Sequence, residues 1–193
     1  MARTKSFDPA QVLHQAMLLF WREGFRQLSM ENLVQKLGVN RYSLYQTFGN
    51  KQDFFHQALV LYTDNIFNRM LRPLQEQQGK TAIIAYFRLI QQQLQHDQAS
   101  AGCMLLNASL NAGQLHEESL NLIKNGLRRQ EESLKKALQQ AIDNNELSRP
   151  RDPLTASRFL ASQVHAMVLL RQNAGKKRVH DVLEFMLAEL EAW

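Results

Sequence analysis

Three helix-start signals and three glycine stops alternate in the first fifty residues, and this pattern constrains the fold more than any other feature of the sequence. The start signals are Asp8, Ser29 and Asn40, and the stops are Gly24, Gly38 and Gly49. Asp, Ser and Asn side chains accept hydrogen bonds from the free amides of a first helical turn, and glycine adopts the left-handed conformation that follows a last turn. The spacing predicts short helices over about residues 9–23, 30–37 and 41–48.

The rest of the chain carries apolar residues at helical spacing. We expect helices over about 51–74, 81–96, 103–112, 115–144, 153–174 and 179–190, with Pro73 ending the first, "NNELSRPRDP" as a linker and Gly175 between the last two. The expected apolar stripe of the first is Phe55, Leu59, Tyr62, Ile66 and Met70. No stretch alternates apolar and polar residues as a strand does. The sequence therefore predicts an all-α protein of about nine helices.

Positive charge is concentrated at the N-terminal end. The 193-residue chain has a formal net charge of +5, and the residues up to Lys51 include seven basic but only three acidic side chains. A charge that served solubility alone would be spread evenly, so this asymmetry indicates an end that binds a polyanion and a nearly neutral body.

Composition and motifs argue against several other classes of protein. Cys103 is the single cysteine, so no intramolecular disulfide can form. The apolar runs are too short to span a bilayer and no export signal is present, so we expect a cytoplasmic protein without membrane contact. The six histidines lack metal-ligand spacing, and no phosphate loop or nucleophile motif occurs. We therefore expect no metal, no cofactor and no catalytic residues.

The segments 30–37 and 41–48, joined by "LGVN", have the pattern of a helix-turn-helix, whose second helix enters the major groove of DNA. Leu44 and Phe48 lie four residues apart and can pack inward. Arg41, Tyr42 and Tyr45 are then left on other faces of the same helix, together with Gln46. One side of this helix is predicted to anchor it and the other to contact DNA.

The stretches "AMLLFWREGF", "LSMENLVQKLGVN", "RYSLYQTF" and "GNKQDFF" resemble, in this order, the DNA-binding region of the tetracycline-repressor (TetR) family of transcriptional regulators. The resemblance covers about residues 9–60. It implies a helix-turn-helix domain over residues 1–52 and a helical effector-binding and dimerisation domain over residues 53–193. It also implies a ligand-responsive regulator, most simply a repressor, that binds a palindromic double-stranded operator as a dimer.

The resemblance further implies a set of DNA-binding residues: Ser29, Asn40, Arg41, Tyr42, Ser43, Tyr45, Gln46 and Lys51. Tyr45 and Lys51 correspond to residues that contact phosphates, and Ser29 to the cap of the first helix of the motif. Asn40, Arg41 and Tyr42 correspond to the base-facing start of the recognition helix. The family commonly has a small residue where Tyr42 stands, so its ring either reads a thymine methyl or sugar or tilts the helix outward. Arg3 and Lys5 form either a loose tail or an arm that contacts phosphate.

In the body, the resemblance implies an effector pocket and a homodimer interface formed by the last two helices. The candidate ligand-binding residues are Tyr62, Phe67, Met70, Tyr86, Phe87, Cys103, Met104, Asn107 and His165. Few of these carry charge, which favours a neutral, lipophilic effector of unknown identity. Cys103 is either a thiol sensor activated by a helix start or a small buried hydrophobe. His165 either lines the pocket or satisfies an interface hydrogen bond.

A second hypothesis assigns the chain to a different class, a helical protein-interaction or scaffold protein without sequence-specific DNA binding. The basic N-terminal end argues against this alternative.

Overall fold

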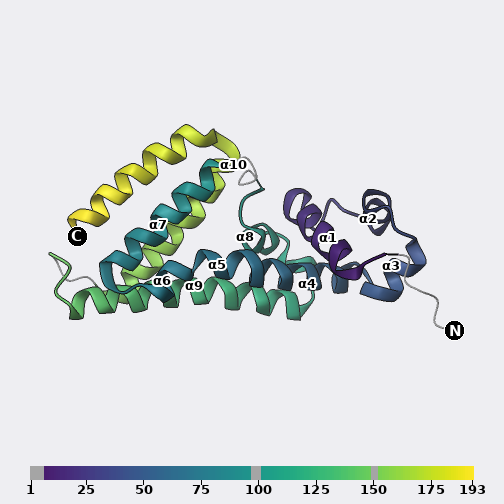
Figure 1. The fold of residues 1–193 in the computed structure, drawn as a ribbon, viewed down its shortest axis with the longest axis horizontal. Helices are drawn as coiled ribbons and strands as arrows, with labels where there is room; N and C mark the ends of the chain where they lie inside the picture. The colour runs from purple at the N-terminus through teal and green to yellow at the C-terminus, as the bar shows by residue number, and fades with distance from the viewer. Residues whose placement is uncertain (1–6, 97–100, 149–151) are drawn as a thin grey trace. The chain divides into compact units, whose positions relative to one another are not determined.

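The computed structural model describes residues 7–96, 101–148 and 152–193 (Figure 1). Over these residues the chain forms helices and no strand, so the all-α prediction is confirmed. The elements are α1 Pro9–Glu23, α2 Met30–Leu37, α3 Arg41–Phe48, α4 Lys51–Tyr62, the π turn η1 Thr63–Phe67, α5 Asn68–Met70, α6 Arg72–Glu76, α7 Gly79–Gln95, α8 Met104–Ser109, the 3₁₀ turn η3 Ala112–Gln114, α9 Glu117–Asp143 and α10 Pro153–Ala192.

The three N-terminal helices begin and end as predicted. Oδ1 of Asp8 accepts a hydrogen bond from the Ala10 amide at 2.9 Å and caps α1. Oγ of Ser29 accepts from the Asn32 amide at 3.1 Å while Oδ1 of Asn32 accepts from the Ser29 amide at 3.0 Å, which completes a capping box at the start of α2. Local capping thus sets helix length here.

The helix predicted over residues 51–74 is interrupted twice. After α4 the backbone widens into the π turn, where Oγ1 of Thr63 donates to the Leu59 carbonyl at 2.8 Å, and regular helix stops at Met70. The prediction that Pro73 ends this helix is wrong, because Pro73 lies in the first turn of α6. Proline is tolerated there since first-turn amides have no partner within the helix.

The π turn also shifts the buried face of this helix. Tyr62 is buried as expected, but Ile66 and Met70 are only half-buried, whereas Phe67 and Leu71 are buried at 6% and 2% exposure. A π turn holds one residue more than an α turn, which rotates the residues after it by about 100°. The single predicted stripe is therefore wrong after Tyr62.

A break at Gly175 is confirmed within α10. Its φ of 83° and ψ of 177° are not helical, so α10 consists of two helical segments that meet at a kink. A side chain would be strained at this positive φ.

None of the helices in the described part of the chain is long and apolar enough to cross a membrane.

The chain divides into two compact units, and each has its own core. Unit 1 combines Met1–Asn65 with Cys103–Lys124. Its core contains a cluster of aromatic side chains that come from α1, α3 and α4. The Phe20 and Phe55 rings pack edge to face at 5.1 Å, and Phe48 stacks on Phe54 at 4.4 Å. These rings seat α3 on the unit.

Unit 2 combines Ile66–Gly102 with Asn125–Trp193. Figure 1 shows α7 running beside α10, and these two helices pack against each other more extensively than any other pair in the unit. Apolar side chains of α7, α9 and α10 fill its interior, including Ile83, Phe87, Leu134, Leu138 and Leu160.

Candidate nucleic-acid interface and effector residues

Helix α3 is anchored on one side and open on the other. Leu44 and Phe48 are buried at 0% and 4% exposure, as predicted from their spacing, while Tyr42 and Tyr45 are 72% and 36% exposed. Arg41 and Gln46 are exposed on the same helix. The outward surface of α3 thus presents a guanidinium, two phenols and an amide, which are groups that bind phosphates and base edges.

The turn before α3 places its first residues at the surface. Gly38 adopts the left-handed conformation with a φ of 64°, and Oδ1 of Asn40 accepts from the Ser43 amide at 3.3 Å. Asn40 therefore caps α3, and its side-chain oxygen is already engaged. The Ser29 side chain is likewise engaged in its capping box. An anion at this position would therefore bind the free backbone amides at the start of α2 rather than the serine hydroxyl.

Arg41 has two contacts within unit 1. Its Nη2 lies 3.0 Å from Oε1 of Glu31 on α2, and its Cζ lies 5.6 Å from the ring centroid of Tyr45. Both members of the ion pair remain more than half exposed. The guanidinium is thus held at the surface between a carboxylate and a phenol ring.

Lys51 is the first residue of α4, and its ammonium lies 4.2 Å from the centroid of the Phe25 ring. Partial burial lowers the pKa of this ammonium from its ordinary value. The cation–π contact fixes the charge beside a helix start, where an anion is also favoured by the backbone amides. Arg3 and Lys5, the proposed N-terminal arm, lie outside the described residues.

The candidate effector residues fall in both units. Unit 1 contains Tyr62, Cys103, Met104 and Asn107, and unit 2 contains Phe67, Met70, Tyr86, Phe87 and His165. Most of them are buried, but Met70, Cys103, Asn107 and His165 are only half-buried.

In unit 1, the Tyr62 hydroxyl and the Cys103 thiol form a hydrogen bond. Burial raises the pKa of the Cys103 thiol, and this outweighs the lowering by backbone amides at the start of α8 and by the Tyr62 hydroxyl. Of the two interpretations of Cys103, the raised pKa argues against the activated thiol sensor, since it disfavours the reactive thiolate. Burial also raises the pKa of Tyr62 well above its ordinary value.

In unit 2, Tyr86 and His165 are joined by a residue that sequence reasoning missed. Nε2 of Gln130 donates to the Tyr86 hydroxyl at 2.8 Å, and Oε1 of Gln130 lies 3.0 Å from Nε2 of His165. Gln130 is 3% exposed, and burial lowers the pKa of His165. The sequence does indicate that Gln130 faces inward, because it lies three residues after Leu127 and four before Leu134 in the apolar stripe of α9.

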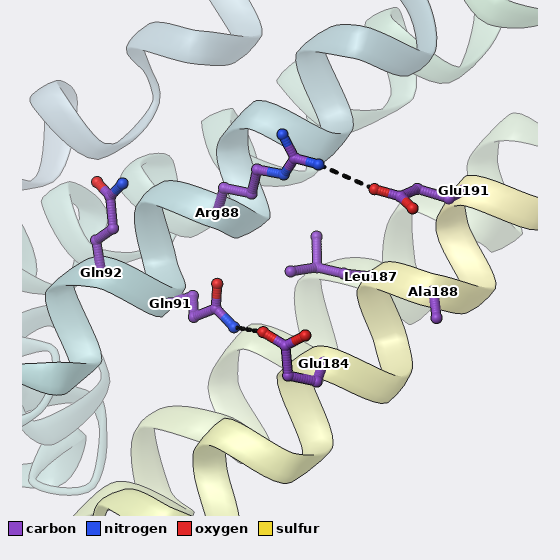
Figure 2. A pocket seen from close by; sticks show the side chains of 7 residues that line it. All are labelled: Arg88, Gln91, Gln92, Glu184, Leu187, Ala188 and Glu191. Atoms are coloured by element: carbon purple, nitrogen blue, oxygen red, sulfur yellow. Dashed lines mark hydrogen bonds and ion pairs between the residues drawn. The ribbon is translucent and has the colours of Figure 1, made fainter.

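Unit 2 also contains a polar pocket of about 310 Å³ that the sequence did not indicate (Figure 2). It is lined by Arg88, Gln91, Gln92, Glu184, Leu187, Ala188 and Glu191. Arg88 and Glu191 form an ion pair at 3.0 Å across it, and the Gln91 amide donates to Glu184. Its polar groups are thus largely satisfied by one another.

Within the described ranges, no group of three or more His, Cys, Asp or Glu side chains could hold a metal ion.

Two family models match the chain. Residues 12–58 match "Bacterial regulatory proteins, tetR family", and residues 79–184 match "Tetracyclin repressor-like, C-terminal domain". The chain is 26% identical over 183 residues to the HTH-type transcriptional repressor ComR of Escherichia coli strain K12, covering 93% of this chain and 87% of ComR. It is also 26% identical to the uncharacterized HTH-type transcriptional regulator YezE of Bacillus subtilis strain 168, covering 99% of this chain and all of that protein.

Solved structures share the fold. The reduced form of E. coli NemR superimposes with a TM-score of 0.79 at 22% identity, covering 94% of each chain. A cysteine mutant of the TetR family transcriptional regulator CifR, complexed with 26-base-pair operator DNA, superimposes with a TM-score of 0.82 at 20% identity, covering 97% of this chain and 98% of CifR.

Proposed function

This chain belongs to the tetR family of bacterial regulatory proteins, and we propose that it is a repressor that binds a roughly palindromic operator as a homodimer and releases it when a small apolar effector binds. The family consists of transcriptional regulators rather than enzymes. The similarity of this chain to ComR, which is named a repressor, supports repression rather than activation.

The observation that carries the proposal is the outward surface of α3. Buried Leu44 and Phe48 fix the helix, and exposed Tyr42 and Tyr45 project from it beside Arg41. The major groove of B-DNA is wide enough to admit one helix and presents a distinct donor and acceptor pattern for each base pair. The excess of basic residues up to Lys51 adds the attraction to phosphate that such docking needs.

We assign the contacts as the resemblance to the family implies them. Tyr45 and Lys51 bind backbone phosphates, and the start of α2 at Ser29 binds another through its amides. The base-facing group is Asn40, Arg41, Tyr42, Ser43 and Gln46. In this proposal residues 1–52 form the DNA-binding domain and residues 53–193 the effector-binding and dimerisation domain.

Dimerisation is proposed through α10. This helix leaves large apolar side chains exposed on both sides of Gly175: Leu154, Phe159, Leu169, Val182 and Phe185. A second copy of the chain would remove this apolar surface from water. Two recognition helices in such a dimer read half-sites about 34–36 Å apart.

The effector is proposed to be apolar with one polar group. The candidate residues are largely aromatic or aliphatic, and the Tyr86–Gln130–His165 chain supplies hydrogen-bonding groups inside unit 2. A ligand that binds better to a conformation unable to engage both half-sites lowers operator affinity by that difference. Because DNA is the partner, we place the protein in the cytoplasm.

The test is selection of genomic fragments on the purified protein, followed by binding of the retained duplex and of a scrambled duplex with the same base composition. We expect a dissociation constant at least about a thousandfold lower for the retained duplex at physiological salt. We also expect two copies of the protein on each duplex. Equal binding of both duplexes would contradict the proposal and favour the scaffold alternative.

A further inference from the structure

An ion pair joins the two helices of the helix-turn-helix. Glu31 lies in the first turn of α2, and Arg41 is the first residue of α3. Oε1 of Glu31 and Nη2 of Arg41 are 3.0 Å apart, and their side chains are 62% and 63% exposed. A pair this exposed contributes little to the stability of a fold. The role of this ion pair therefore concerns the exposed surface on which it lies rather than the stability of the fold.

The second contact of Arg41 restricts it further. Its guanidinium carbon lies 5.6 Å from the centroid of the Tyr45 ring, one helical turn further along α3. A guanidinium has a planar face that packs on aromatic rings and a fork of five N–H donors. With the ring on one side and the Glu31 carboxylate on one nitrogen, the guanidinium is contacted on two sides while most of its donors remain unused by these two contacts.

We propose that Glu31 is a positioning residue for base readout, which directs the Arg41 guanidinium toward a base edge and away from the nearest phosphate. This inference rests on the proposed operator binding. Bidentate contacts from arginine to guanine specify sequence, whereas contacts to phosphate do not. A carboxylate this close to the DNA-facing residues also repels phosphate, so it weakens binding to every sequence while it aims one specific contact. The ratio of specific to non-specific affinity is raised by the directed contact, because the repulsion weakens binding to both kinds of sequence alike.

The chain contains a matched control for this residue. Glu23 of α1 pairs with Lys36 of α2 at 2.9 Å, and both side chains are partly exposed. This pair also joins two helices of unit 1 but includes no residue of α3. Glu23→Gln therefore removes the same charge as Glu31→Gln and leaves Arg41 held in place.

The experiment compares the wild type, Glu31→Gln and Glu23→Gln on the duplex retained from genomic selection and on its scrambled version. We expect Glu31→Gln to bind the scrambled duplex more tightly and to lower the ratio of the two affinities about tenfold, the loss of one bidentate base contact. Glu23→Gln should keep the wild-type ratio within about twofold, as an exposed acid elsewhere should.

A double-mutant cycle then separates positioning from a structural role. If Glu31 acts through Arg41, adding Glu31→Gln to Arg41→Ala should leave the affinity ratio of Arg41→Ala unchanged. A role limited to stabilising α2 would lower the ratio in both backgrounds and would also lower the thermal midpoint. An unchanged ratio for Glu31→Gln beside a normal wild-type preference would overturn the positioning role alone. A wild type without sequence preference would overturn the proposed function as well.

Discussion

Gln130 of α9 bonds His165 of α10 at 3.0 Å while its amide nitrogen donates to the Tyr86 hydroxyl of α7 at 2.8 Å. Since the amide nitrogen of Gln130 serves Tyr86, its oxygen is the acceptor, and His165 must donate from a protonated Nε2. One buried side chain therefore links three helices of unit 2, α7, α9 and α10, and selects the tautomer of the histidine.

Gln130→Leu is expected to destabilise the protein by about 1–3 kcal/mol, because it removes the hydrogen bonds that Gln130 makes to Tyr86 and His165 inside unit 2. Equilibrium denaturation in urea measures this loss. The control is Gln139→Leu on the same helix, since Gln139 bonds Asp143 on the exposed face. Equal losses in the two variants would contradict a buried linking role.

Stability should fall as the pH is lowered through the range below 6.5. Burial lowers the pKa of His165 in the folded state beneath its ordinary value of 6.5, so the unfolded chain takes up the proton first. The contribution of His165 to stability is thus complete above pH 6.5 and is lost as the pH falls toward the folded-state pKa. Urea unfolding at a series of pH values gives the slope.

His165→Gln should flatten this slope, whereas His180→Gln should leave it in place, because His180 is exposed on the same helix. A slope that survives in His165→Gln would show that another group carries it.

Arg171→Met should cost about 1–3 kcal/mol of folding free energy. Arg171 is 8% exposed, and its Nε and Nη2 donate to the Leu94 and His96 carbonyls at the end of α7, at 2.9 Å and 3.4 Å. Methionine keeps an apolar stem but leaves these carbonyls without their cation. Arg158→Met, which breaks an exposed ion pair with Glu131, should cost less than about 1 kcal/mol. Denaturation midpoints that shift equally would refute the distinction.

Lys51→Met should reduce the salt dependence of operator binding. Neutralising one phosphate contact lowers the slope of log affinity against log salt by about one per subunit. Titrations at four or more salt concentrations measure it. Lys136→Met, an exposed lysine of α9, is the control and should leave the slope unchanged. An unaltered slope for Lys51→Met would remove Lys51 from the phosphate contacts.

Phe185→Ser should convert the dimer to a monomer at micromolar concentration and abolish operator binding at that concentration. Phe185 is 69% exposed on α10, and burying such a ring between two subunits favours association by about 1.5–3 kcal/mol per copy. Sedimentation velocity measures the oligomeric state. Leu110→Ser removes an apolar side chain that is 79% exposed in unit 1 and should leave a dimer. A dimer that persists in Phe185→Ser would exclude the proposed interface at this residue.

Features that depend on neighbouring residues were predictable from the sequence. The capping side chains Asp8, Ser29 and Asn40 set their helices through bonds within three residues, and the break at Gly175 follows from its own backbone. The two faces of α3 follow from the helical period alone. The same period fails beyond Thr63, where the π turn changes the number of residues per turn.

Contacts between distant segments were not predictable. Periodicity places Gln130 on the inner face of α9, but it does not say that Tyr86 and His165 lie opposite it. In the same way, the sequence identified Arg41 but not its partner Glu31, because helical spacing says nothing about the angle at which α2 meets α3. The candidate effector residues share a chemical type, and chemical type does not indicate which of the two cores each side chain belongs to.

The π turn makes chain length at Thr63–Phe67 a determinant of side-chain direction. Removing one amino acid there would restore an uninterrupted α-helical period, and because Phe67 and Leu71 would then lie four and eight residues after Tyr62, both would keep facing the interior. Homologues that lack this extra residue therefore bury the equivalent positions downstream, each one residue closer to the equivalent of Tyr62. An alignment of such sequences that omits a one-residue gap at this point would pair interior residues with surface ones.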